Sequence, residues 1–234
     1  MGWLDLTPDE WNAVRLSIKV ATWAMLASLP LGILVAMVLA RGKFWGKSVL
    51  NGIVHLPLIL PPVVTGYLLL VAFGKRGIIG AFLENTFGLV FAFRWTGAAL
   101  AAALMALPLM VRAVRLSIES IDQRLEGAAS TLGASPLRVF ATVTLPLAAP
   151  GMLAGTILTY VKALVEFGST ITFVSNIPGQ TQTLSLSIYS LLQTPDGDAA
   201  AFCLILLSIL LALAALLASE LLARRLTNRM AGKP

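Results

Sequence analysis

Few residues of this chain have side chains that could do covalent chemistry, and these residues are scattered. Cys203 is the only cysteine and His55 the only histidine, so an intrachain disulfide and a thiolate metal site are excluded. There is no Walker A glycine loop, no Ser/His/Asp set and no plausible pair of catalytic carboxylates. The sequence therefore predicts no catalytic residue, no metal site and no cofactor bound by this chain.

Polar residues gather instead in the segment Glu126–Pro146, which reads EGAASTLGASPLRVFATVTLP. It is broken by glycine and lies between long apolar runs, in a chain whose residues are 58% hydrophobic. A polar, interrupted segment of this kind has a shape suited to binding a separate soluble partner. We therefore expect a docking loop here.

The composition indicates that the solvent of this protein is the lipid bilayer. The 234 residues have a mean hydropathy of +0.88, and only 12% are charged, against about 25% in a typical soluble domain. A spanning helix needs about 20 mostly apolar residues, and five runs approach or exceed this length: 16–40, 49–73, 95–111, 147–165 and 199–222. We predict one all-α membrane domain over residues 1–234, a helical bundle with about five transmembrane helices.

The basic residues predict the orientation of this bundle. If five helices alternate, most lysines and arginines fall on one side, in the connections after the first and third helices and in the C-terminal tail: Arg41, Lys43, Lys47, Arg112, Arg115, Arg124, Arg138, Arg224, Arg225, Arg229 and Lys233. Connections rich in lysine and arginine are cytoplasmic. The N-terminus is then outside, while the 121–146 loop and the C-terminus are in the cytoplasm.

Two segments fit neither a full span nor a simple connection. Residues 78–93 carry Glu84 and Asn85 within a short apolar run, and residues 170–193 are richer in Ser, Thr and Gln. We expect both to cap the outer mouth, and leave open whether either enters the membrane. The second run contains Pro57, Pro61 and Pro62, which would bend or break its helix beside a pathway, or kink it in the ordinary way.

The polar segment predicts a helical hairpin over residues 121–146. A first helix through Leu132 would be stopped by Gly133, and Ser135 with Pro136 would begin a second helix. That second helix would run through Val143 and end at Pro146. The alternative is an amphipathic hairpin that lies on the lipid headgroups.

Lys162 and Glu166 lie four residues apart near the end of the fourth run. This spacing allows an ion pair on one helix face. Ionisable residues within a span are often functional. The alternatives are a structural ion pair, which we favour, and a position near the outer interface.

The hairpin sequence resembles the EAA signature of permease subunits of bacterial ABC importers. The matching pattern is Glu126, Ala128 and Ala129, then Gly133, Val143 and the pair Leu145-Pro146. Further stretches resemble the molybdate branch of that family: HLPLILPPVVTGYLLL, FGKRGIIG, LPLMVRAVRLSIE and EFGSTITFVSNIPGQTQTL. Gly127 within the motif and Val165 before EFG depart from the usual pattern.

The resemblance implies a transport subunit rather than an enzyme. ATP and Mg²⁺ would be used by a separate pair of ATPase subunits, which would dock on the hairpin and drive alternating access. The expected coupling residues are Glu126, Ala128, Ala129, Leu132, Gly133 and Ser135. The further partners implied are a second copy of the permease, which completes the pore, and an external oxyanion-binding protein; nucleic acid is not among them.

The implied cargo is molybdate, with tungstate expected to follow. A bare dianion is very costly in an apolar medium, so the pathway needs neutral donors that also let the ion leave. The candidates are the hydroxyls of Thr65, Ser169, Thr170 and Thr172, although such hydroxyls often bond helix carbonyls instead. Two alternatives stay open: a sulfate or thiosulfate permease, and an ion-coupled secondary transporter.

Overall fold

A computed structural model describes residues 7–230, except for the side chains of residues 219–220 and 222–230. Arg224, Arg225, Arg229 and Lys233, assigned above to the cytoplasmic side, therefore lie outside the described side chains. The described part consists of helices and connections, without a strand. The helices are α1 Pro8–Arg41, α2 Lys47–Ile59, α3 Pro62–Phe73, α4 Ile78–Phe87, α5 Trp95–Glu119, α6 Gln123–Thr131, α7 Pro136–Val139, η1 Phe140–Thr144, α8 Leu145–Leu164, α9 Gly168–Val174, α10 Leu184–Leu191 and α11 Asp198–Met230.

The five apolar runs correspond to five helical units, which confirms the predicted fold class. Among the described residues, α1, α5, the helix 136–164 and α11 are each long and apolar enough to cross a membrane. The pair α2 and α3 meets the same criterion only when taken together. The chain thus has four long spans, or five if the bent pair counts as one.

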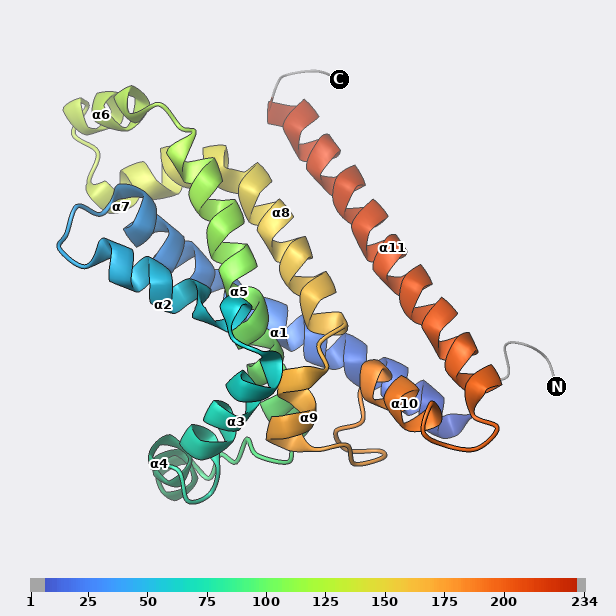
Figure 1. The fold of residues 1–234 in the computed structure, drawn as a ribbon. Coiled ribbons are helices and arrows are strands. Elements are labelled where there is room, and N and C mark those ends of the chain that lie inside the picture. The colour runs from blue at the N-terminus through green and yellow to red at the C-terminus, as the bar shows by residue number, and fades with distance from the viewer. Residues whose placement is uncertain (1–6, 231–234) are drawn as a thin grey trace.

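Helix α5 forms the centre of the bundle and packs chiefly against α1 and α8 (Figure 1). Its buried face is rich in alanine, and small residues of its neighbours complete the contact. A Cβ on Gly32 of α1 would lie 2.3 Å from Met110 Cγ, and one on Gly155 of α8 would lie 2.9 Å from Met110 Sδ. Small residues at these crossings let the backbones approach closely, as is common between membrane helices.

The proline-rich run forms two helices rather than one. Helix α2 ends at Ile59, α3 begins at Pro62, and the two are bent by 112°. Pro61 and Pro62 lack the amide hydrogens that a continuous helix would need. The predicted break is confirmed, and it turns α3 so that it packs on α9.

The predicted end of the second hairpin helix at Pro146 is wrong. Helix α7 continues through the π-helical turn η1 into α8, so that residues 136–164 form one helix with Pro146 inside it. A proline ring clashes with the carbonyl of the residue four positions earlier in an α-helix. The wider turn of η1, in which Leu145 N–H donates to Phe140 O, precedes Pro146 and relieves this conflict.

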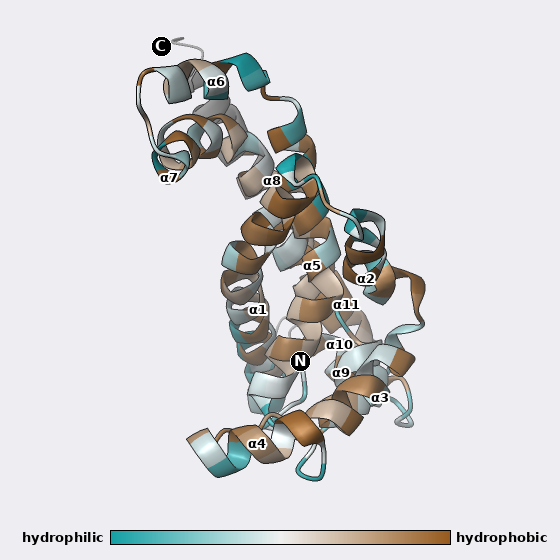
Figure 2. Ribbon diagram, turned by 90° about the vertical axis from the view of Figure 1, so that its left-hand side faces the viewer, coloured by the Kyte–Doolittle hydropathy of each residue, from teal (hydrophilic) through white to brown (hydrophobic). Residues whose placement is uncertain are grey.

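The two ends of the bundle carry different structures. The hairpin of α6 and α7 lies at one end, together with the C-terminal end of α11 (Figures 1 and 2). Helices α4, α9 and α10 lie toward the opposite end. The segments expected to cap the outer mouth are thus on the opposite side from the hairpin, although α9 is largely buried against α3 and α5.

Candidate functional site

The hairpin has the helix, glycine and helix order that its sequence predicts. Asp122 caps α6, and its Oδ1 accepts a hydrogen bond from Arg124 N–H at 2.9 Å. Gly133 then takes a φ of +85°, a left-handed conformation typical of a helix C-terminus. Ser135 caps α7, its Oγ accepting from Arg138 N–H at 3.4 Å, and Pro136 is the first residue of that helix.

The apolar side chains of the hairpin point mostly into open space. No residue of α6 is buried. Leu132 is 88% exposed, Leu137 is 76% exposed, and Leu125 and Ala128 are exposed as well, whereas Ala129 is half-buried. A tip with small residues and bare leucines is suited to contact with a partner.

Glu126 differs from the other candidate coupling residues because its carboxylate is turned toward the bundle. Its Oε1 accepts hydrogen bonds from Arg41 Nη2 at 3.1 Å and from Thr144 Oγ1 at 2.8 Å. Arg41 Nε also lies 3.1 Å from Oε2, without hydrogen-bond geometry. Glu126 therefore ties α6 to the end of α1 and to η1.

Sequence reasoning missed Arg41 and Thr144 as parts of this site. Arg41 stood out only as a basic residue that indicates topology, and Thr144 did not stand out at all. These residues are distant in sequence from Glu126, so no local spacing could reveal the contact. A weak signal existed, since Arg41 is the last residue of a long apolar helix on the side assigned to the loop.

The four pathway candidates come together where α3 packs on α9. Thr65 lies on α3, while Ser169, Thr170 and Thr172 lie on α9. Two glycines make this packing close. A Cβ on Gly66 would lie 2.5 Å from Ser169 O, and one on Gly168 would lie 2.8 Å from Pro62 Cβ.

The hydroxyls of these residues are not equivalent. Thr172 Oγ1 donates to Gly168 O at 2.9 Å, and Ser169 Oγ donates to Glu166 Oε1 at 2.9 Å. Thr170 is buried. Thr65 Oγ1 is buried and has no hydrogen-bond partner among the described residues. A buried donor without a partner is costly. Of the four candidates, the Thr65 hydroxyl is therefore the one that most needs a hydrogen-bond acceptor from outside this chain.

Lys162 and Glu166 form a pair that orders the turn between α8 and α9. Lys162 Nζ lies 2.7 Å from Glu166 Oε2, and Glu166 Oε1 also accepts from the amide of Ser169 at 3.2 Å. The side chain of Glu166 is only 2% exposed, against 29% for Lys162. This carboxylate caps the start of α9, which supports the structural interpretation of the pair.

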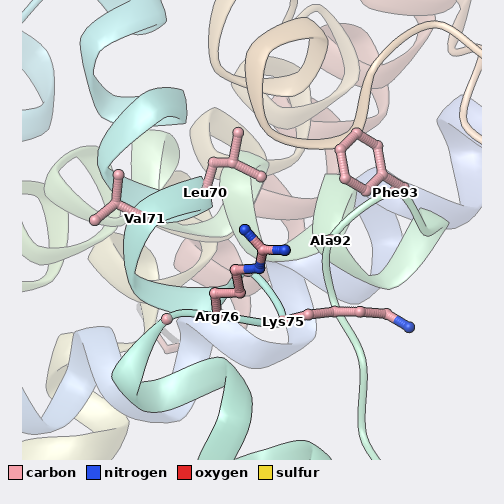
Figure 3. Close-up of a pocket in the computed structure, with 8 residues that line it drawn as sticks. Leu70, Val71, Lys75, Arg76, Ala92 and Phe93 are labelled. Atoms are coloured by element: carbon pink, nitrogen blue, oxygen red, sulfur yellow. The ribbon is translucent and has the colours of Figure 1, made fainter.

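A cavity of about 570 Å³ lies elsewhere, where α3 turns into α4. Figure 3 shows the Arg76 guanidinium pointing into the space between Leu70 and Phe93, whereas Lys75 extends away. None of the four hydroxyl residues lines this cavity. Its walls are mostly apolar and its polar side chains are the cations Lys75 and Arg76, so it supplies none of the neutral hydroxyl donors proposed for the pathway.

The sequence is similar to a known protein family over most of its length and to known transport proteins. The family described as binding-protein-dependent transport system inner membrane component matches residues 28–228. A molybdenum transport system permease protein of Escherichia coli (strain K12) is 55% identical over 228 residues, which covers 97% of this chain and 99% of that protein. A sulfate transport system permease protein of Salmonella typhimurium is 35% identical over 193 residues, with coverage of 82% and 69%.

Solved structures show the same arrangement of helices. A bacterial ABC transporter involved in import of the acidic polysaccharide alginate matches with a TM-score of 0.75 and 20% identity, over 95% of this chain and 81% of that one. The alginate transporter in complex with its pentasaccharide-bound periplasmic protein matches with a TM-score of 0.74 over 96% and 81%. At this identity the likeness concerns the fold alone.

Proposed function

We propose that this chain, which belongs to the family of binding-protein-dependent transport system inner membrane components, is the permease subunit of an ATP-driven importer of molybdate. Tungstate would follow the same route, because the two tetrahedral oxyanions are similar in size and charge. The chain itself does no covalent chemistry. It provides the path through the membrane and the surface on which the energy source acts.

Sequence similarity supports molybdate over sulfate as the cargo. The molybdenum relative is 55% identical over almost the whole of both chains, whereas the sulfate relative is 35% identical over a smaller part. The pathway candidates are neutral hydroxyls, which suit a dianion that must be released again. Glu166 does not contact the ion in this proposal, because its carboxylate is already bound by Lys162 and Ser169.

The observation that carries the coupling mechanism is the exposed hairpin. Helix α6 buries none of its own residues, and Leu132 at its end and Leu137 on α7, on either side of the Gly133 turn, are largely exposed. In the proposed assembly two ATPase subunits bind and hydrolyse ATP with Mg²⁺, and each docks on the hairpin of one of two permease copies. A docked partner that changes shape makes different contacts in the two states, which is what shifts the pathway between outward-facing and inward-facing forms.

The same assembly places the N-terminus outside and the C-terminus in the cytoplasm. Arg41, Lys43 and Arg138 lie in or beside the segments at the hairpin end, which agrees with the enrichment of cytoplasmic connections in basic residues. Helices α4 and α10 would then meet an external oxyanion-binding protein on the other side.

Uptake measurements test this proposal. The permease is reconstituted in vesicles with its ATPase and binding protein, and uptake of radioactive molybdate is followed with ATP inside. We expect uptake that needs ATP and binding protein, that tungstate inhibits strongly and that sulfate inhibits weakly. Uptake that prefers sulfate would favour the sulfate or thiosulfate alternative. Uptake that persists without ATP, in an intact ion gradient, would instead favour a secondary transporter.

A further inference from the structure

Helix α6 has few contacts of its own with the membrane helices. It packs against α7 and η1, and none of its residues is buried. Its backbone joins α5 through Ser120–Asp122 and joins α7 through Gly133. The position of α6 relative to α1 is therefore set by side chains rather than by a packed interface.

The side chains that set it converge on one carboxylate. Glu126 Oε1 accepts from Arg41 Nη2 and from Thr144 Oγ1, and Arg41 Nη2 also lies 3.3 Å from Ile121 O. The side chains of Arg41 and Glu126 are only 17% and 18% exposed. Thr144 is 1% exposed and belongs to η1. The end of α1, the entry to α6 and the start of the 136–164 helix thus meet at this point.

We propose that Arg41 is a positioning residue that transmits the movement of α6 to α1. This inference rests on the proposed function, and it assigns to Arg41 a part in coupling that its charge and place in the sequence do not indicate. When a partner pulls or pushes α6, the chain connections move α5 and α7. The contact between Arg41 and Glu126 makes α1, a 34-residue helix, follow the same movement, so that the central helices of the bundle move together.

The π-helical turn supports this inference. Such turns interrupt α-helices locally and are frequent at functional sites. Here η1 places Thr144 so that its hydroxyl reaches Glu126 Oε1 at 2.8 Å. The same oxygen thus connects the second helix of the hairpin to Arg41. Removing Arg41 would leave Glu126 bound to η1 alone and free α1 from the hairpin.

The test compares Arg41→Gln with Lys43→Gln in the complete transporter. Lys43 is exposed, lies in the same connection and has no ion pair or hydrogen bond among the described residues. We expect Arg41→Gln to keep the ATPase bound and ATP hydrolysis active, while molybdate transported per ATP falls about tenfold, equivalent to about 1.4 kcal/mol. Lys43→Gln should match the wild type.

A charge exchange separates positioning from general damage to the fold. The double variant Arg41→Glu/Glu126→Arg should recover at least part of the transport lost by Arg41→Gln, because the pair is rebuilt in reverse. Wild-type transport per ATP in Arg41→Gln would overturn the inference, and so would an equal loss in Lys43→Gln. If Arg41→Gln does not accumulate, Arg41→Lys takes its place. We expect a smaller loss of transport per ATP, because lysine keeps the positive charge that pairs with Glu126 but cannot reach both Glu126 and Ile121 O with one planar group.

Hydrogen exchange provides a readout that does not depend on cargo. In the purified transporter, Arg41→Gln should speed amide exchange in residues 123–131, whereas Lys43→Gln should not. If the wild-type transporter moves no molybdate but this exchange difference is present, the proposed cargo is wrong and the positioning role stands. Unchanged exchange in a transporter that does move molybdate would count against the positioning role alone.

Discussion

Two carboxylates, Glu126 and Glu166, each contact more than one described residue, and they act on different helices. Glu126 joins α6 to α1 and η1, and Glu166 joins the end of α8 to the start of α9. Each is largely shielded from solvent, so removing its cation would leave a charge that is poorly compensated. Both carboxylates hold neighbouring helices together, and neither lines the cavity between α3 and α4.

Thr65 makes the sharpest prediction at the scale of single residues. Its buried hydroxyl has no partner among the described residues, so Thr65→Val removes an unsatisfied group while keeping the shape. We expect the unfolding free energy to stay equal or to rise by up to about 1–3 kcal/mol, with a matching change in melting temperature. Molybdate uptake should fall several-fold. Differential scanning fluorimetry and vesicle uptake measure the two effects.

The matched control for this substitution is Thr172→Val on the facing helix. Its hydroxyl already bonds Gly168 O, so its loss should affect uptake less. Equal uptake in the Thr65 variant and the wild type would remove Thr65 from the pathway. A loss of stability in the Thr65 variant would mean that the hydroxyl has a partner in the assembled protein.

Sequence reasoning at this scale succeeds where the cause is local. The turn at Gly133 and the cap at Ser135 follow from residues that are neighbours in the chain, and both are present. The spacing of Lys162 and Glu166 likewise predicts their ion pair. Arg41 and Glu126 are 85 residues apart, and their contact exists only because α1 and the hairpin meet at the same end of the bundle. The sequence predicts only that both segments lie on the same side of the membrane, and no local spacing indicates that these two side chains meet.

At the scale of elements, the hairpin shows which helix ends a local sequence pattern can predict. The start of the second helix at Ser135 and Pro136 is confirmed, whereas the first helix begins at Gln123 rather than at Ile121, and the second helix does not end at Pro146. A proline inside a helix removes one hydrogen bond and clashes with a carbonyl of the preceding turn, but it need not end the helix, since Pro30, Pro108 and Pro150 also lie inside helices of this chain. The π-helical turn before Pro146 relieves the clash at that position, and such turns have no clear sequence signature. The hairpin is therefore rigidly continuous with a membrane-spanning helix on one side.

Gly133→Ala tests whether the hairpin needs its left-handed turn. A Cβ there meets open space, so the expected cost is backbone strain of about 1–2 kcal/mol rather than a clash. We expect the variant to fold, to bind the ATPase about tenfold more weakly and to transport less. Gly127→Ala on α6 is the control, because it also meets open space but has no positive φ, and it should leave binding unchanged. Equal binding by the two variants would contradict the docking role of the turn.

Gly66→Ala tests the close packing of α3 on α9. The added methyl would lie 2.5 Å from Ser169 O, a backbone atom that cannot move away without shifting α9. We expect the unfolding free energy to fall by about 1–3 kcal/mol and uptake to be largely lost. Gly52→Ala on α2 serves for comparison, since its Cβ would meet nothing within 4 Å. Equal melting temperatures of the two variants would show that α9 has room to move.

At the scale of the whole molecule, the hydrophobic runs predict most of the fold. Each of the five runs corresponds to a helical unit, because the membrane imposes the length of every span. The depth at which α9 packs was not predictable, since α9 owes its burial to contacts with α3 and α5, which are distant in the sequence. The orientation of the bundle in the membrane is an expectation that rests on the basic residues alone.

Labelling from the two sides of the membrane tests that orientation. In a chain with Cys203→Ser, a single cysteine replaces Asn85 on α4 or Ser130 on α6, both of which are exposed. Helices α4 and α6 lie at opposite ends of the bundle (Figure 1). Because the basic connections should be cytoplasmic, a membrane-impermeant maleimide should label Asn85→Cys in intact spheroplasts and Ser130→Cys only after the membrane is opened. Labelling of Ser130→Cys in intact spheroplasts would place the hairpin outside, beyond the reach of a cytoplasmic ATPase, and would contradict the coupling mechanism together with the topology.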